Sequence, residues 1–431
     1  MKKAIGIILI ILLLGSCIGL DALAVRYDTV ATRWWSGTFA SVETESGDTQ
    51  LKAMDSAAEL TQLIAEEGIV LLKNNGTLPM APSKDNRGVA LLGYASYSPM
   101  YIGAGSVSQS GSYLSNDFID FYDAFETAGF SVNKDMKEYY AKYGNSNGAT
   151  GDMSGSGWSQ ATGVDDGPLY GEGEASKALL SALEKAKAEA KTAVLVFSRV
   201  GAEGGDCALE MDGAANGDAG KHYLQFQQTE IDLIEYAEEN FENVIVVINS
   251  SNAMELGELD NEKVDAVLWI GGPGSTGIQA LADIVAGDVN PSGRLPDTYA
   301  YDLKTAPSYW SATAGTYANY DEFGESTYTY NGVTYTFNNK VDGGVTYDVE
   351  GIYVGYRFYE TADTEGYLKF EDTVQYPFGY GLSYTSFDWE VVNSSFGDTH
   401  GDIKIEVKAS VASALIRQHG HKSLQMARRQ R

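Results

Sequence analysis

Short apolar runs alternate with amphipathic stretches over most of the first 300 residues. Runs that are apolar throughout predict buried strands at 89–92, 192–197, 244–248 and 266–270. Apolar residues at helical spacing predict helices within 56–74, which ends in the apolar run 69–72, and at 118–128, 175–191, 229–240 and 279–286. Short apolar strands separated by helices are typical of a parallel sheet covered on both faces. We therefore predict one doubly wound α/β domain, an α/β sandwich with a mostly parallel sheet, over residues 53–300.

The character of the chain changes after Pro296. Residues 299–384 hold 16 of the 28 tyrosines, so we predict a Tyr/Gly-rich β segment over residues 301–385. Two alternating runs there flank Asn331-Gly332, which predicts a β-hairpin over 327–337 with a type I′ turn. The tyrosines either stack on sugar rings or fill the surface of a β-rich segment.

Strand-like alternation continues over residues 386–408 and then stops at Lys408. This pattern predicts the first strands of a β-sandwich that is truncated, because a complete one needs about seven strands. Residues 409–431 contain no Asp or Glu and five Lys or Arg. This anomalous segment is either a basic tail or the product of a frame shift or truncation near residue 409.

The N-terminus has the layout of a bacterial secretory signal, which we place at residues 1–24. Lys2 and Lys3 precede a continuous apolar run over residues 4–14, which is short for a membrane span of about 20 residues. Three fates stay open: a lipid on Cys17, cleavage after the Ala-Leu-Ala that ends at residue 24, or an uncleaved anchor. We expect an exported protein, either membrane-anchored or extracellular or periplasmic, with residues 25–52 as a spacer.

Composition and charge exclude several classes of function. The formal net charge is −29 and the pI about 4.4, so the surface repels phosphate backbones and nucleic acid is not an expected partner. The two cysteines, Cys17 and Cys207, exclude a disulfide framework and a cysteine-based zinc site. With only four histidines, we expect no metal and no cofactor.

Two glycine-rich loops follow predicted strands, where open α/β sheets carry functional groups. The first holds Glu203, and a carboxyl inserted into a cleft from such a loop can act as a general acid/base; the alternative is a solvated acidic loop. The second begins with Gly103, Gly105 and Ser106. It is not a Gly-x-Gly-x-x-Gly motif, and no Lys-Ser/Thr follows it, so it does not predict a nucleotide cofactor.

Three stretches resemble the second domain of glycoside hydrolase family 3, the β-glucosidase type. They are residues 66–79 (EEGIVLLKNNGTLP), residues 287–296 (GDVNPSGRLP), and residues 376–384 (YPFGYGLSY) preceded by residues 350–357 (EGIYVGYR). Their order and spacing also match the family. The resemblance spans about residues 56–408 and implies an α/β sandwich followed by a fibronectin-like domain, which residues 386–408 would begin.

The resemblance assigns the general acid/base to Glu203. The family pattern is Glu-Gly-x-Asp-Arg, and Glu203, Gly204, Gly205 and Asp206 match it, with Cys207 where Arg is common. Gly204, Gly205 and Asp206 would support the loop. In this family a Gly/Ser-rich loop at the position of Gly103, Gly105 and Ser106 faces the cleft, which implies contact with the sugar.

The mechanism implied is retaining hydrolysis of a β-linked oligosaccharide or aryl glucoside, with the two carboxyls about 5–5.5 Å apart. The family nucleophile is an aspartate in a Ser-Asp-Trp-like motif on a separate (β/α)₈ barrel, which this sequence does not contain. Phe387-Asp388-Trp389 is the nearest string, and we interpret it as structural. We therefore expect the acid/base half of a site, from a member with the barrel downstream, and no hydrolysis by this chain alone.

Two alternatives from other classes remain. One is a non-catalytic, surface-tethered protein that binds carbohydrate through the Tyr-rich region. The other is a flavodoxin-like nucleotide or flavin binder, against which the absence of a phosphate loop argues.

Overall fold

The computed structural model describes residues 47–80, 87–102, 118–144, 166–201, 207–311, 325–338, 350–396 and 401–411. Residues 1–59 form one compact unit and residues 60–431 another. The second unit, to which the following description applies, contains the sheet. The expected signal segment 1–24 lies outside the described residues, as do most of the spacer 25–52 and most of the segment 409–431.

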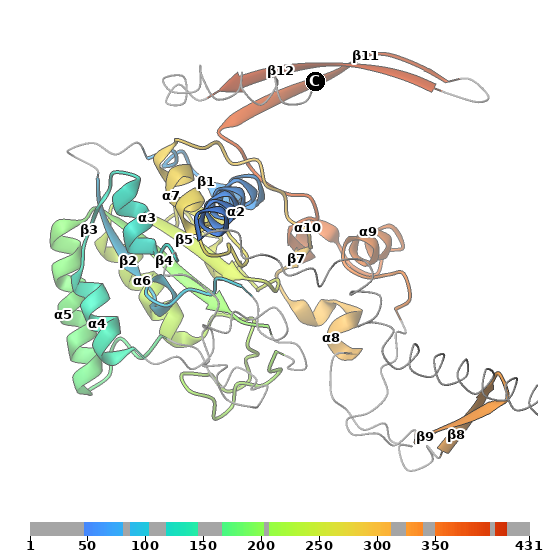
Figure 1. The fold of residues 1–431 in the computed structure, drawn as a ribbon, viewed down its shortest axis with the longest axis horizontal. Coiled ribbons are helices and arrows are strands. Elements are labelled where there is room, and N and C mark those ends of the chain that lie inside the picture. Colours follow the sequence, from blue (N-terminus) through green and yellow to red (C-terminus); the bar gives the residue numbers. More distant parts are fainter. Residues whose placement is uncertain are drawn as a thin grey trace, which may run out of the picture. The chain divides into compact units, whose positions relative to one another are not determined.

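A six-stranded sheet with the order β1-β6-β5-β4-β2-β3 forms the centre of the unit (Figure 1). Its strands are β1 (Val70–Asn74), β2 (Gly88–Leu92), β3 (Ser131–Val132), β4 (Thr192–Arg199), β5 (Asn243–Ser250) and β6 (Ala266–Trp269). All neighbouring pairs are parallel except β1 with β6, which is antiparallel. The predicted mostly parallel sheet is confirmed, with an antiparallel edge strand that the apolar pattern did not reveal.

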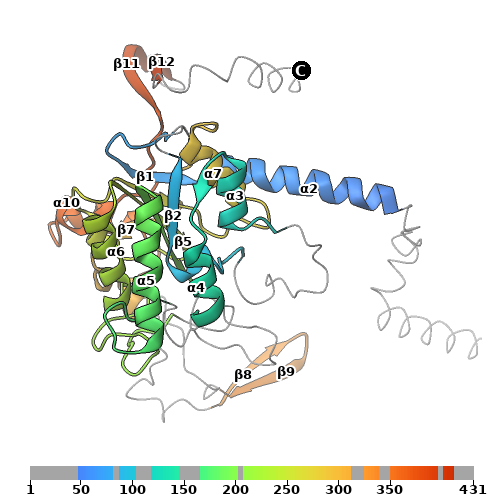
Figure 2. The same cartoon turned by 90° about the vertical axis from the view of Figure 1, so that its left-hand side faces the viewer.

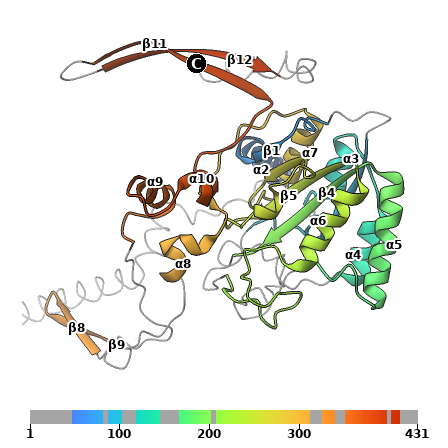
Figure 3. The ribbon, with the colours of Figure 1, turned by 180° about the vertical axis from the view of Figure 1, so that it is seen from behind.

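Helices cover both faces of this sheet (Figures 2 and 3). They are α3 (Phe121–Thr127) and α7 (Ile278–Ala286) on one face, and α4 (Asp135–Tyr143), α5 (Glu174–Glu189) and α6 (Gln228–Asn240) on the other. Successive strand residues point to opposite faces. In β4, Val194 packs in the cluster that contains α3 and α7, whereas Leu195 packs in the cluster that contains α4, α5 and α6. A strand buried on both sides must be apolar throughout, which explains the runs in the sequence.

The three stretches that carry the family resemblance meet beside β1. The backbone N–H of Leu382 donates to the Leu71 carbonyl at 2.8 Å, and the N–H of Leu295 donates to the Tyr380 carbonyl at 2.8 Å. Gly293 lies so close to the end of α2 (Gly47–Gly68) that a Cβ atom there would be 2.3 Å from the Ile69 carbonyl oxygen. These stretches therefore form a structural junction, in which residues 376–384 return to pack on the α/β core.

The Tyr-rich region contains the predicted hairpin and, in addition, helices. Strands β8 (Glu325–Tyr330) and β9 (Val333–Asn338) are joined by Asn331 and Gly332 with φ values of 52° and 77°, which confirms the type I′ turn. Other elements are β7 (Tyr299–Ala300), η3 (Leu303–Thr305), α8 (Pro307–Ser311), α9 (Tyr356–Thr364), α10 (Phe370–Thr373) and β10 (Val374–Tyr376). Helix α9 forms because Tyr359 and Ala362, three residues apart, are both buried, Tyr359 against Ala300 and Val374.

Several tyrosines are core residues, an outcome that neither interpretation of the Tyr-rich region anticipated. Tyr299, Tyr359, Tyr376 and Tyr384 are between 2% and 8% exposed. The Tyr384 hydroxyl donates to the Ile284 carbonyl at 2.9 Å, which ties the returning segment to α7. Tyrosine suits this position because its ring is apolar and its hydroxyl finds a backbone acceptor.

The predicted strands after residue 385 form a long antiparallel hairpin of β11 (Thr385–Phe396) and β12 (Gly401–Val411). β12 continues to Val411, past Lys408, where we expected the alternation to stop. Asp388 is paired with Lys408, and its neighbour Trp389 with Val407. The string Phe387-Asp388-Trp389 is thus part of a paired strand, in agreement with its structural interpretation.

Candidate active site

The residues that flank the predicted catalytic segment lie at the edge of the sheet where the parallel strands end. Glu203, Gly204, Gly205 and Asp206 are outside the described residues, as are Gly103, Gly105 and Ser106. The structure does describe the residues that flank both segments. Before the Glu203 segment, the described chain continues from β4 to residue 201, and after this segment it begins again at Cys207. The Gly103 segment follows Ile102. The contacts of these flanking residues are described next.

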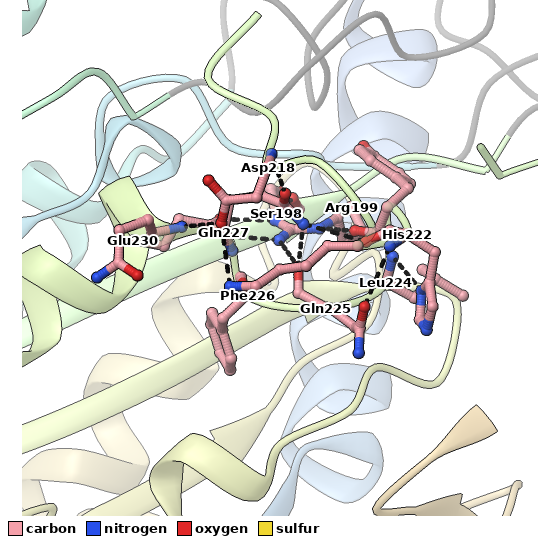
Figure 4. Close-up of polar contacts among 12 residues, drawn as sticks. Ser198, Arg199, Asp218, His222, Leu224, Gln225, Phe226, Gln227 and Glu230 are labelled. Carbon is pink, nitrogen blue, oxygen red and sulfur yellow. Dashed lines mark hydrogen bonds and ion pairs between the residues drawn. The ribbon is translucent and has the colours of Figure 1, made fainter. Parts of the chain in front are cut away.

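Arg199, the last residue of β4, connects the two sides of the Glu203 segment (Figure 4). Its side chain is 1% exposed, and all five N–H groups of the guanidinium find acceptors. Nε donates to the Tyr223 carbonyl at 2.6 Å, one terminal nitrogen to the Gln225 carbonyl at 2.9 Å, and the other to the carbonyl of Ser198 at 2.9 Å. The remaining two N–H groups bind Glu230 at 2.7 and 2.6 Å. Both ends of the loop over residues 200–225 are thereby fixed to β4.

Glu230 also anchors the start of α6. It accepts a hydrogen bond from the backbone N–H of Gln227 at 2.9 Å, as part of a capping box at the helix N-terminus. Asp218 accepts from the N–H of Gln228 at 2.6 Å, so the loop itself caps the same helix. The sequence analysis singled out neither Gln227 nor Glu230, since glutamine is not a usual N-cap residue and the pairing of Glu230 with Arg199 leaves no trace in the sequence.

Asn249, near the end of β5, fixes the segment that leads to Gly103. Its buried amide donates to the carbonyls of Met100 and Gly271 at 2.8 and 2.7 Å. Its oxygen accepts from the N–H of Met100 and from the Ser198 hydroxyl, both at 2.8 Å. The carboxyl ends of β4, β5 and β6 and the segment after β2 are thus joined through one side chain.

The turn over residues 271–274, which the sequence predicts as a helix entry, packs against the same segment. Gly274 donates its N–H to the Tyr101 carbonyl at 2.8 Å, and α7 begins four residues later at Ile278. Tyr101, two residues before Gly103, is therefore held beside the end of β6.

A second buried network fastens the loop after Glu203 to the rest of the unit. His222 Nε2 lies 2.9 Å from Glu255 Oε1, and Gln225 donates to Glu255 Oε2 at 2.6 Å. The N–H of Leu303 also donates to Glu255, at 2.7 Å. Burial alone raises the pKa of Glu255, but the hydrogen bonds from His222, Leu303 and Gln225 outweigh it and lower the pKa below its usual range.

Cys207 is the first described residue after the Glu203 segment. It is half-buried and packs beside the buried pair Met211 and Tyr223. The Tyr223 hydroxyl accepts from the N–H of Val200 at 3.1 Å. The segment of residues 202–206 is therefore short and is bordered by packed residues at both ends.

Within the described ranges, no group of three or more His, Cys, Asp or Glu residues is placed to hold a metal ion. Likewise, none of the helices in the described part of the chain is long and apolar enough to span a membrane.

Residues 69–384 match the family described as "Glycosyl hydrolase family 3 C-terminal domain". A beta-glucosidase from Ruminococcus albus is 28% identical over 344 residues, which cover 78% of this chain and 28% of that protein. Beta-glucosidase A from Butyrivibrio fibrisolvens is 30% identical over 360 residues, which cover 80% of this chain and 36% of that protein. This chain therefore spans about a third of the length of these two curated relatives.

The fold is similar to that of solved structures as well. Beta-glucosidase 3B from Thermotoga neapolitana, in complex with glycerol, aligns with a TM-score of 0.58 at 24% identity, over 83% of this chain and 42% of that one. At this sequence identity, the similarity shows a shared fold.

Proposed function

Because the chain belongs to glycosyl hydrolase family 3, as a β-glucosidase-like glycoside hydrolase domain, we propose that it supplies the acid/base half of a retaining glycosidase site. The observation that carries the proposal is the frame around residues 202–206. Arg199 ties the end of β4 to the loop that follows residues 202–206, and the Asn249 network holds the residues that precede Gly103. An acid/base must hold its position relative to the scissile bond, and such a frame provides that.

Glu203 is the general acid/base in this proposal. In the first step its carboxylic acid protonates the leaving glycosidic oxygen while an aspartate of a barrel domain attacks the anomeric carbon, which forms a glycosyl-enzyme and releases the alcohol. In the second step the Glu203 carboxylate removes a proton from water, which attacks the anomeric carbon and frees the aspartate. Gly204, Gly205 and Asp206 shape the loop, and Gly103, Gly105 and Ser106 contact the sugar from the neighbouring segment.

The substrates we propose are β-linked oligosaccharides or aryl glucosides. The nucleophile would come from a (β/α)₈ barrel, since the sequence holds no Ser-Asp-Trp-like motif apart from Phe387-Asp388-Trp389, which is in β11. The chain alone should therefore not hydrolyse glycosides. We also propose that it is exported and is either tethered through residues 1–24 or released.

The proposal is tested by measuring release of nitrophenol from an aryl β-glucoside. We expect no turnover from the purified chain and measurable turnover when it is joined to the barrel region of a family member. Hydrolysis of the aryl β-glucoside by the purified chain alone would contradict the proposal that the chain needs a barrel domain. Sugar binding without turnover in the joined protein would instead favour a non-catalytic carbohydrate-binding protein.

A further inference from the structure

A cavity of about 280 Å³ opens on the α4 and α5 side of the unit. Its lining includes Tyr94, Tyr139, Tyr140, Tyr143, Ser176 and Asn216. Tyr94 follows β2, Tyr139 to Tyr143 form the end of α4, Ser176 is in the first turn of α5, and Asn216 is in the loop after the Glu203 segment. Each of these positions is at the carboxyl edge of the sheet, so the cavity shares an edge with the proposed acid/base.

The tyrosine rings form a fixed aromatic wall. Tyr94 and Tyr140 are buried, at 8% and 4% exposure, and their rings meet edge to face with centroids 5.9 Å apart. Tyr139 lies 5.2 Å from Tyr140 and 5.5 Å from Tyr143, with 31° between the planes of the latter pair. Tyr139 and Tyr143 are half-buried, so they combine packed support with accessible ring surface. Such surfaces suit the flat, C–H-rich face of a pyranose ring.

None of the described residues that line the cavity carries a charge, although the whole chain has a net charge of −29. The polar groups are hydroxyls and one side-chain amide. Burial, with Asp166 and Tyr143 nearby, raises the pKa of Tyr139 to about 12, so its hydroxyl stays neutral and can donate a hydrogen bond. The Tyr143 hydroxyl is oriented by Glu174 and Lys142, each at 2.7 Å. A neutral, hydroxyl-bearing ligand fits this lining, because its described residues are uncharged and the nearby Lys142 ammonium already binds the Tyr143 hydroxyl and lies 3.8 Å from Glu174.

Asn216 lies at the rim of the cavity. Its φ value of 56° is in the left-handed region, which asparagine adopts more readily than most other non-glycine residues. This conformation places an amide-bearing residue at the rim, on the loop that also carries Glu203.

We propose that this cavity binds one neutral pyranose ring of a glycoside. The cavity is near the lower end of the range of ligand sites, about 300–1,000 Å³, so it suits one ring rather than a longer chain. The choice of sugar as the ligand class rests on the proposed function, whereas the aromatic wall, the neutral lining and the size are independent of it.

The test is calorimetric titration of the full chain with methyl β-D-glucopyranoside and with cellobiose. We expect millimolar binding, weakened about tenfold or more in Tyr143→Ala, which removes an accessible ring. A second variant, Ala175→Trp, fills the cavity from its exposed rim without removing a core contact, and should abolish binding. Tyr170→Ala is the matched control, because Tyr170 is 65% exposed and outside the lining, and it should bind like the wild type.

Equal affinities in the wild type, Tyr143→Ala and Ala175→Trp, each with an unchanged thermal unfolding midpoint, would overturn the proposal. Absence of sugar binding by the wild-type chain would overturn it too. Neither result bears on the proposed acid/base, which is judged separately by Glu203-dependent turnover in the barrel-joined protein. If that turnover persists while the cavity variants bind normally, this inference fails and the proposed function stands.

Discussion

At the scale of single residues, the candidate site depends on buried polar groups that reach across the sequence. Arg199 bonds to residues 24 to 31 positions further on, and Asn249 to Met100, 149 positions away. Most of their hydrogen-bond partners are on other elements. A buried polar group whose hydrogen bonds are satisfied in this way acts as a rigid anchor instead of destabilising the fold.

Replacing Arg199 should destabilise the fold strongly. Arg199→Met leaves the Glu230 carboxylate buried without its partner, and we expect the free energy of unfolding to fall by about 3–5 kcal/mol in urea titrations. The Cys207 thiol should also react faster with an alkylating reagent, because the loop loses its attachment to β4.

Lys134→Met is the matched control, since Lys134 and Glu126 form an exposed ion pair with side chains 59% and 40% accessible. This variant should unfold almost like the wild type. A loss in Arg199→Met no greater than in the control would contradict the anchoring role.

Glu255 should make stability depend on pH in the acid range. Its pKa in the folded protein is lower than the ordinary value of 4.5, so its contribution is present above pH 4.5 and is lost as the pH falls through the folded pKa. The difference in unfolding free energy between the wild type and Glu255→Gln should therefore shrink as the pH is lowered below 4.5. A difference that stays constant over this range would show that the carboxylate is not stabilised by His222, Leu303 and Gln225.

At the scale of elements, the family stretches beside β1 act as a junction between the sheet and the returning segment 376–384. Leu71, Leu295 and Leu382 take part through backbone hydrogen bonds, so the pairing depends on close backbone approach rather than on side-chain chemistry. Stability should accordingly be sensitive to added side-chain volume at the closest point.

Gly293→Ala tests this sensitivity. The new Cβ atom would lie 2.3 Å from the Ile69 carbonyl oxygen, a backbone atom that cannot rotate away. We expect a loss of about 1–3 kcal/mol in unfolding free energy. Gly167→Ala is the comparison, because a Cβ at Gly167, which lies outside any helix or strand, meets nothing within 4 Å and should change stability by less than about 0.5 kcal/mol. Equal stability of the two variants would argue against the junction.

The sequence predicted the elements whose apolar period is unambiguous. β4, β5 and α5 lie within two residues of their expected ends, since a strand buried on both faces or an amphipathic helix leaves a direct trace in the pattern. Strand β1 was missed, because its apolar run was included in the helical stretch predicted within 56–74, whereas α2 ends at Gly68 and Val70–Asn74 forms a strand. The two-residue strand β3 and helix α9 were not predicted either, because tertiary contacts decide them.

The assignment of Glu203 stays a prediction, because residues 202–206 lie outside the described residues. The sequence singled out this glycine-rich loop by its place after an apolar strand, and the structure describes the residues that flank it. Arg199, Asn249 and the pair His222 and Glu255 were missed, because their partners are distant in sequence and a charged residue at a strand end gives no sign of burial.

At the scale of the whole molecule, the chain covers 28% and 36% of the two relatives it was compared with, while the family match covers residues 69–384. A two-carboxyl mechanism needs its second carboxyl about 5–5.5 Å from the first. On the proposed mechanism, a stable and well-positioned acid/base half would have no activity until a barrel supplied the nucleophile.

The most direct test of this account is the effect of Glu203→Gln on the barrel-joined protein, compared with Asp206→Asn as the matched loop variant. We expect Glu203→Gln to lower kcat/KM for cellobiose by about 10²-fold or more, and by less for a dinitrophenyl glucoside, whose leaving group needs no protonation. The alkaline limb of the pH profile should also disappear, whereas Asp206→Asn should retain it. Equal effects on both substrates, or an unchanged pH profile in Glu203→Gln, would contradict the assignment of Glu203 as the acid/base.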